Sequence, residues 1–218
     1  MALMVRNPVS RPIWVYGAIA VLYLMPLPLR PFTHVIQETN DASWQMWWLW
    51  WAKESARLGQ SPYFTDRLLH PTGASPYLSA TDMVTALLSI PLQHLIGLVP
   101  TYNLLCFASL VFSAWAMRRL ALEVTGSHEG ALLAGAAFAF MPFVSVSLNM
   151  GHLVWVDLGF IPLAVLGLIR LEEGGIGAVS LRALSLSLAV LVSLYQGLFL
   201  LVFTLVYACY RTVVLAFD

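Results

Sequence analysis

The chain has 218 residues, of which 60% are hydrophobic and only 10% are charged, and its mean hydropathy is +0.79. Soluble globular domains carry about 25% charged residues, so this composition excludes an ordinary soluble domain and predicts a polytopic, all-α membrane protein. The formal net charge of zero gives no indication of a nucleic-acid partner. The whole chain, 1–218, is expected to form a single transmembrane module.

The first apolar segment runs from Pro12 to about Leu29, close to the roughly 20 residues that an α-helix needs to cross a bilayer. It ends without a small-residue cleavage pattern, so we interpret it as a retained signal-anchor helix. Arg6 and Arg11 precede it, and the positive-inside rule then places the N-terminus on the cytoplasmic side of the cell's inner (plasma) membrane. Residues 31–101 would therefore form a large loop on the external face.

A tryptophan-rich helix is predicted inside this loop. Asn40-Asp41-Ala42-Ser43 is a helix start signal and Gly59 is a stop signal. Between them, four tryptophans recur at helical spacing and form one stripe on the helix: Trp44, Trp47, Trp48 and Trp51. The polar side chains of this segment lie mostly off the stripe: Gln45, Lys53, Glu54 and Arg57. Because tryptophan favours the headgroup level of a membrane, we expect an amphipathic helix lying along the external surface.

Segment 82–99 is ambiguous because its 18 residues contain Pro91, Gln93 and His94 near the middle. If it crossed the membrane, Arg118 and Arg119 at the end of the next span would face outward, against the positive-inside rule. We therefore expect a re-entrant or surface helix there. The other spans are expected at about 102–120, 130–148, 153–171, 179–194 and 198–214, which gives six spans with the remaining span-end arginines on one side.

In this topology the connectors 149–152 and 195–197 open on the same face as the large loop. Asp41 could cap the tryptophan-rich helix or act as a general base on a hydroxyl, and the two roles are compatible. His152 and Asp157 flank the second external connector, where ionisable groups beside a span are costly and by default functional. The alternatives are an interfacial histidine and an aspartate at a helix end. We predict these three residues as the catalytic candidates.

Six further residues are candidates for substrate binding: Lys53, Arg57, Arg67, His70, Tyr195 and Gln196. The three cations could grip a phosphate on the external face, or they could simply form a solvated helix face. The other three have plain alternatives as a loop histidine and a polar hairpin. No HExxH, CxxC or P-loop motif is present, so no cofactor or metal is predicted, although separated carboxylates are compatible with a divalent ion.

Several short motifs between residues 12 and 200 occur in a characteristic order. They are Asp41 early in the first external loop, Leu-Gly-Gln-Ser-Pro (58–62), His-Pro-Thr-Gly (70–73), Tyr-Asn (102–103), Ala-Gly-Ala-Ala-Phe-Ala-Phe-Met-Pro (134–142) and Gly-His (151–152). Together with the aromatic helix, this order resembles the type C membrane glycosyltransferases, in particular their bacterial YfhO-like and unassigned members.

The resemblance implies an inverting transfer of a sugar from a polyprenyl-phosphate-linked donor to an acceptor on the external (periplasmic) face. Asp41 would match the acid of the first loop in that family, and His152 or Asp157 the polar site of the second loop. The family usually has more spans, which implies that this chain is part of a longer protein. Two other functions remain open: a lipid or glycolipid transporter (a flippase), and a non-catalytic membrane-assembly subunit.

Overall fold

The structure is a computed structural model that describes residues 10–36, 41–76, 82–171 and 174–217. Over these residues it is helical and contains no β-strand, only an isolated antiparallel bridge between Thr65 and Ala74. The predicted all-α architecture is therefore confirmed. The elements are α1 (Ser10–Tyr23), η1 (Leu27–Leu29), α2 (Asp41–Leu58), α3 (Met83–Ile96), α4 (Leu98–Thr125), α5 (His128–Ala139), α6 (Pro142–Met150), η3 (Leu153–Trp155), α7 (Phe160–Arg170), α8 (Ile176–Val192) and α9 (Leu194–Phe217).

Four described segments are long and apolar enough to cross a membrane: Leu98–Thr125, His128–Met150, Leu153–Arg170 and Leu194–Val214. They coincide with four of the six predicted spans. The other two predicted spans, 12–29 and 179–194, correspond to the shorter helices α1 and α8, so the count of six is not confirmed. Helix α1 stops at Tyr23 because prolines at 26 and 28 cannot continue it.

Helix α3 is also short. Its 14 residues span about 21 Å, less than the roughly 30 Å of a bilayer core. This length agrees with the prediction that segment 82–99 does not cross the membrane. Gly97, with φ of 89°, ends α3 and lets α4 begin at Leu98 in a new direction.

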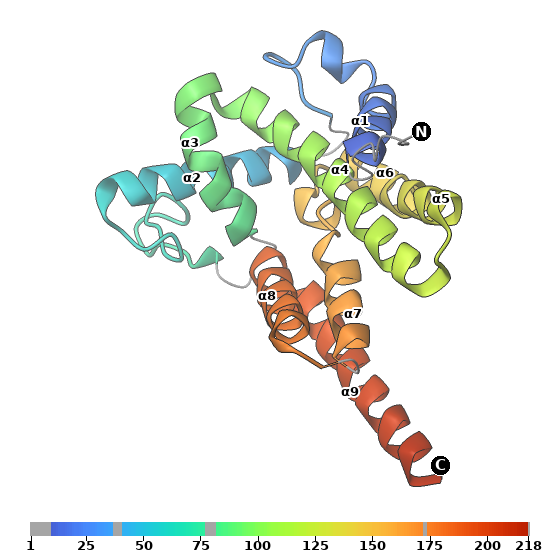
Figure 1. The fold of residues 1–218 in the computed structure, drawn as a ribbon. Coiled ribbons are helices and arrows are strands. Elements are labelled where there is room, and N and C mark those ends of the chain that lie inside the picture. Colours follow the sequence, from blue (N-terminus) through green and yellow to red (C-terminus); the bar gives the residue numbers. More distant parts are fainter. Residues whose placement is uncertain (1–9, 37–40, 77–81, 172–173, 218) are drawn as a thin grey trace.

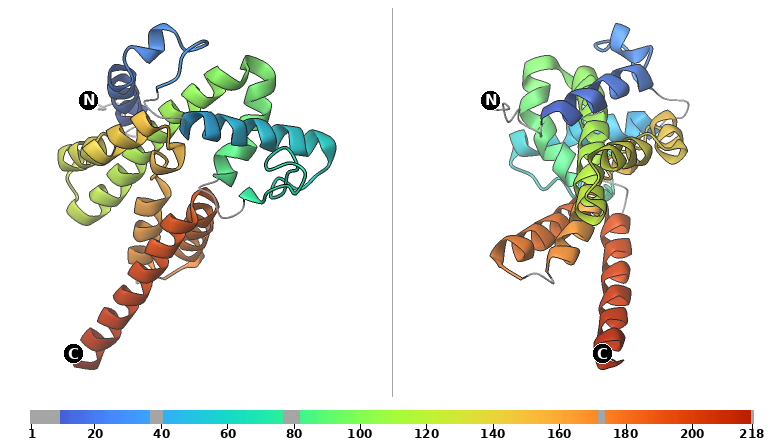
Figure 2. Two further views of the ribbon diagram at one scale, coloured as in Figure 1. Left: turned by 180° about the vertical axis from the view of Figure 1, so that it is seen from behind. Right: turned by 45° about the vertical axis from the view of Figure 1, so that its right-hand side comes forward.

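Helix α4 is the centre of the arrangement, because α1, α3, α5 and α7 all pack against it (Figure 1). Gly135 permits the closest of these approaches: a Cβ there would lie 2.3 Å from Tyr16 Oη and 2.4 Å from the Ala114 carbonyl oxygen. Helices α7, α8 and α9 form a second group. The C-terminal half of α9 extends away from the rest of the molecule, as both views in Figure 2 show.

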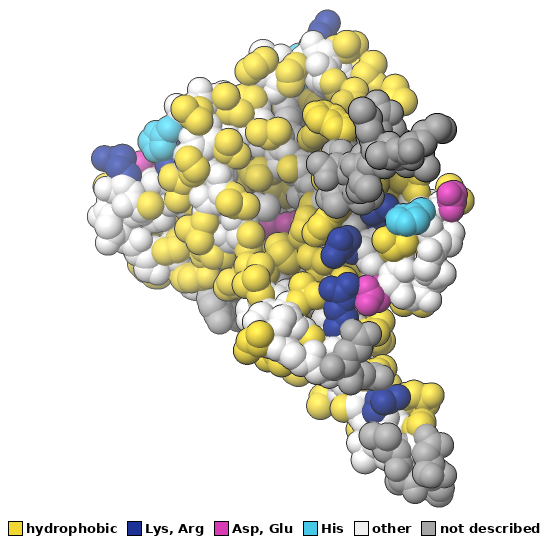
Figure 3. Space-filling view, viewed as in Figure 1, with side chains coloured by type: hydrophobic (Ala, Val, Ile, Leu, Met, Phe, Trp, Pro, Cys, Tyr) yellow, Lys and Arg dark blue, Asp and Glu magenta, His cyan; other side chains and the backbone are white. Residues whose placement is uncertain are grey.

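Charged side chains are gathered in a few places on an otherwise hydrophobic surface (Figure 3). At the C-terminal ends of α4 and α7, Arg170 Nη2 lies 2.5 Å from Glu123 Oε2, and the Arg119 guanidinium lies over the ring of Trp115. The arginines that end the predicted spans 102–120 and 153–171 therefore do lie at the same end of the bundle.

The predicted topology counts Arg182, in the connector before span 179–194, among the arginines at span ends, but it is buried two turns inside α8. Its guanidinium donates to the Ala164 carbonyl at 2.9 Å and to the Thr204 hydroxyl. Arg182 is therefore a buried hydrogen-bond donor that joins α8 to α7 and α9. Its position gives no information about topology.

The predicted lipid-facing tryptophan stripe is wrong for two of its four members. Trp48 and Trp51 are 0% and 1% exposed, and each indole N–H donates to a backbone carbonyl, Asp82 O at 3.1 Å and Pro62 O at 2.9 Å. Gln45, expected on the polar side, is also buried. Helix α2 turns these two tryptophans toward α3 and the following loop, where burying the rings removes a large apolar surface from solvent and the indole N–H groups find partners.

Replacing Trp48 by Ala is expected to destabilise the protein by about 3–5 kcal/mol, because a fully buried ring and its hydrogen bond are lost. Trp14→Ala is the matched control, since that ring is 77% exposed on α1 and its loss should cost within about 0.5 kcal/mol. Thermal unfolding in detergent compares the two. Equal small effects would contradict the buried position of the stripe.

Candidate functional site

Asp41 and His152 form a direct contact. The Nε2 atom of His152 lies 2.8 Å from Oδ2 of Asp41, although the residues are 111 positions apart in the sequence. A carboxylate only accepts hydrogen bonds, so Nε2 carries the proton and donates it. The two side chains are 55% (Asp41) and 33% (His152) exposed, which leaves them accessible to a ligand. The structure therefore brings together two of the three predicted catalytic residues.

The backbone around Gly151 makes this contact possible. Gly151 has φ of 80°, and a Cβ added to it would lie 2.3 Å from the Ala42 backbone nitrogen and 2.5 Å from its Cα. The start of α2 thus packs directly on Gly151, which places Asp41 beside His152. Tyr102 on α4 holds the other side of the turn, since its hydroxyl donates to the Gly151 carbonyl at 3.3 Å. Asp41 is the first residue of α2, where the helix dipole favours a negative charge.

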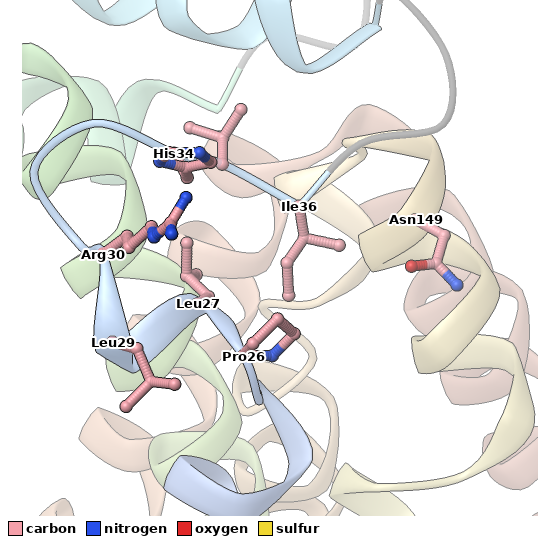
Figure 4. Close-up of a pocket in the computed structure, with 8 residues that line it drawn as sticks. Pro26, Leu27, Leu29, Arg30, His34, Ile36 and Asn149 are labelled. Carbon is pink, nitrogen blue, oxygen red and sulfur yellow. The ribbon is translucent and has the colours of Figure 1, made fainter.

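A cavity of about 600 Å³ opens next to this turn. Figure 4 shows Arg30 and His34, from the segment after η1, on one side of it and Asn149, from the last turn of α6, on the other. Apolar residues complete the wall: Pro26, Leu27, Leu29, Val35 and Ile36. Asn149 lies three residues before His152, so the turn at the end of α6 connects the cavity to the Asp41–His152 contact, although neither Asp41 nor His152 lines the cavity.

Asn103 fixes the segment that carries Arg30 and His34. Its side-chain Nδ2 donates to the carbonyls of Pro31 and His34, at 2.7 and 2.8 Å. Asn103 is buried at the start of α4, one residue after Tyr102. Tyr102 thus anchors one wall of the site through Gly151, and Asn103 anchors the other through the Pro31–His34 segment.

A second, apolar groove lies on the other side of η1. It has a volume of about 270 Å³ and shares Leu27 with the cavity. Its lining is almost wholly hydrocarbon: Val21, Leu24, Leu27, Pro28, Pro31, Pro100, Asn103, Leu104 and Phe107. A polar-mouthed cavity next to an apolar groove can accommodate an anionic head group together with part of an acyl or prenyl chain.

The three cations predicted to bind phosphate, Lys53, Arg57 and Arg67, lie around Glu54 and away from Asp41. Arg57 forms two 2.8 Å hydrogen bonds to Glu54, and Arg67 lies 3.6 Å from the same carboxylate and over the rings of Trp50 and Trp51. The hydrogen bond from Arg57 holds the pKa of Glu54 below its usual range. Lys53 and Arg57 follow Asp41 by 12 and 16 residues on α2, which corresponds to about 18 and 24 Å. This cluster therefore does not form part of the Asp41–His152 site.

The sequence predicts Asp157 and Gln196 on the exposed external face, but both side chains are buried. Asp157 is 5% exposed and Gln196 is 1% exposed, and the amide nitrogen of Gln196 donates to the carbonyls of Val154 and Asp157. The Gln196 amide satisfies two backbone carbonyls in the break between η3 and α7, groups that need a hydrogen-bond partner when they are buried in an apolar interior. Tyr195 is half exposed, and its ring centroid lies 5.8 Å from that of Trp155.

His70 is exposed in the loop that follows α2. This loop packs against α2, since Tyr63 lies against Trp48 and the Trp51 indole donates to the Pro62 carbonyl. The N-cap position of α2 is residue 40, which lies outside the described residues.

Three residues of the site were not predicted: Arg30, His34 and Asn103. The signal that could have found Arg30 is its position directly after the first apolar segment, on the side of the membrane where the positive-inside rule disfavours arginine. Asn103 could have been found as an amide in an otherwise apolar span, which needs a hydrogen-bond partner. Within the described part of the chain, no group of three or more His, Cys, Asp or Glu side chains could hold a metal ion.

Comparison with known proteins adds no further assignment. No protein-family model, no curated protein and no solved structure matches this chain.

Proposed function

We propose that the protein transfers a sugar from a lipid-phosphate-linked donor, of the polyprenyl-phosphate class, to a hydroxyl acceptor at the external (periplasmic) surface of the inner membrane. The observation that carries the proposal is the 2.8 Å contact between His152 and Asp41, which the Asn149–His152 turn connects to a cavity lined by Arg30 and His34. A carboxylate, an orienting histidine and cations for a phosphate are the groups that this chemistry needs.

The proposed reaction is a single displacement. The acceptor oxygen attacks the anomeric carbon of the sugar while Asp41 takes the acceptor's proton. The bond from that carbon to the phosphate oxygen breaks on the opposite face, and lipid phosphate leaves with the electron pair. Arg30 and His34 bind this phosphate, whose charge grows as the bond breaks. The N–H of His152 holds the Asp41 carboxylate in place, so His152 is a positioning residue.

The test is transfer of radiolabelled sugar from synthetic polyprenyl-phosphate sugars by the purified full chain in detergent or liposomes. The expected result is product whose anomeric configuration is inverted relative to the donor. Absence of transfer and of sugar release, across a panel of polyprenyl-phosphate donors, would contradict the proposal.

Replacing Arg30 by Gln is expected to raise the KM for the donor roughly 10- to 100-fold, because a charge-assisted hydrogen bond to phosphate is worth about 1.5–3 kcal/mol. Arg57→Gln is the matched control. Arg57 is an exposed arginine on the remote part of α2 that pairs with Glu54, and its loss should leave KM within about twofold. A larger effect at Arg57 than at Arg30 would assign the phosphate to the Glu54 cluster instead.

A lipid or glycolipid transporter is the second candidate. It is favoured by the burial of Asp82 and Asp157 among apolar helices, because ionisable groups inside a membrane domain often serve transport. Liposomes containing the protein separate the two functions: a transporter moves a fluorescent lipid-phosphate analogue between leaflets without breaking its sugar–phosphate bond.

A further inference from the structure

Two carboxyl groups are buried close together with no cation beside them. Asp82 caps the N-terminus of α3 and Asp157 lies in the break between η3 and α7, and they are 1% and 5% exposed. Gln196 at the start of α9 ties down the Asp157 backbone, and α3 packs against α8, the helix that leads into this start. No ion pair to either is found among the described residues, and Asp82 Oδ2 and Asp157 Oδ1 have no hydrogen-bond partner. Two negative charges in an apolar interior need neutralisation.

Two neutral oxygens at the α8–α9 junction, which holds the Asp157 segment, are also unpartnered. Gln196 donates through Nε2 to the carbonyls of Val154 and Asp157, at 2.8 and 3.0 Å, and its Oε1 is left without a donor. Ser193, one turn earlier at the junction of α8 and α9, is 3% exposed and its Oγ is likewise unpartnered. Buried polar atoms without partners are rare in folded proteins, and several at one place indicate a missing ligand.

The chemistry of these four groups identifies the ligand. A proton on one carboxyl would supply one donor to an acceptor-rich cluster and leave the Gln196 oxygen unsatisfied. A divalent cation accepts lone pairs from all four groups, and its two positive charges balance the two carboxylates. Carboxylate, amide and hydroxyl oxygens without nitrogen or sulfur are the donor set of hard cations.

We propose that Asp82, Asp157, Ser193 and Gln196 form a buried site for a hard divalent cation of the Ca²⁺ or Mg²⁺ class. The ion joins the start of α3 to the break before α7 and to the α8–α9 junction. The ion would link segments that are far apart in the sequence, so the proposed role of the site is structural. It is separate from the Asp41–His152 contact and is independent of the proposed function.

The test is thermal unfolding of the purified full chain after removal of divalent ions by a chelator, followed by addition of CaCl₂ or MgCl₂. At a concentration about 100 times Kd, one of these ions should raise the unfolding temperature of the wild type by on the order of 5 °C. Asp82→Asn and Asp157→Asn should abolish the shift. Asp66→Asn, on an exposed loop residue, should retain it in full.

Measuring the stability of each variant without metal separates loss of the cation site from a failure to fold. Without metal, the two Asn variants should be at least as stable as the wild type, because each removes an uncompensated buried charge. Ser193→Ala removes only one unpartnered oxygen, so it should weaken cation affinity while leaving metal-free stability unchanged. Absence of any shift in the wild type, or an undiminished shift in both Asn variants, would overturn the proposal.

Discussion

Asp41→Asn is expected to reduce kcat for sugar transfer by about 10²- to 10⁴-fold, the usual contribution of a general base. Asn keeps the shape of the side chain and its place at the start of α2, but it cannot accept the acceptor's proton. The protein should still fold, because Asp41 is largely exposed and the neutral amide oxygen still accepts a hydrogen bond from His152. Initial-rate transfer assays at saturating donor measure the effect.

Asp66→Asn is the control for this variant, since it makes the same chemical change on an exposed loop residue away from the cavity. Its kcat should equal that of the wild type. Gel filtration and thermal unfolding of Asp41→Asn should also match the wild type. Full transfer activity in a folded Asp41→Asn protein would remove Asp41 from the mechanism.

Gly151→Ala is expected to be the most damaging small substitution in the site. The positive φ alone costs about 1–2 kcal/mol for a residue with a side chain. The new methyl group would also lie within 2.5 Å of the Ala42 backbone, which adds an overpacking cost of about 1–3 kcal/mol. To relieve the collision, the start of α2 must move away from His152, so transfer activity should fall together with stability.

Gly126→Ala isolates the steric part of this effect. Gly126 has φ of 66° at the end of α4, and a Cβ there would meet nothing within 4 Å. It should lose only the roughly 1–2 kcal/mol of backbone strain and keep wild-type activity. If the two variants proved equally stable and equally active, the close packing of Ala42 on Gly151 would be contradicted.

Asp41 and His152 could be predicted from the sequence because the relevant signals are local. A carboxylate at a helix start and a Gly-His pair after an apolar segment are both visible without a fold. Their contact could not be predicted, because it depends on the packing of α2 against a turn 111 residues later. The cavity was missed for the same reason: Arg30 and Asn149 come from segments that only the tertiary structure brings together.

The prediction of the tryptophan-rich helix shows the limit of periodicity. The spacing of Trp44, Trp47, Trp48 and Trp51 correctly indicates one face of a helix. Periodicity does not tell whether that face meets lipid or protein, since both are apolar. The buried carbonyls of Asp82 and Pro62, which accept the indole N–H groups of Trp48 and Trp51, settle the choice, and they lie in segments whose positions the sequence does not specify.

The central claim is that Asp41 and His152 act as one unit in transfer, and a double-mutant cycle on kcat/KM tests it most directly. The variants are Asp41→Asn, His152→Gln and the double variant, each compared with the wild type. If His152 acts only by positioning the Asp41 carboxylate, His152→Gln should be impaired in the wild-type background and should cost nothing further once Asp41 is Asn. Independent, multiplicative losses from the two substitutions would contradict the account.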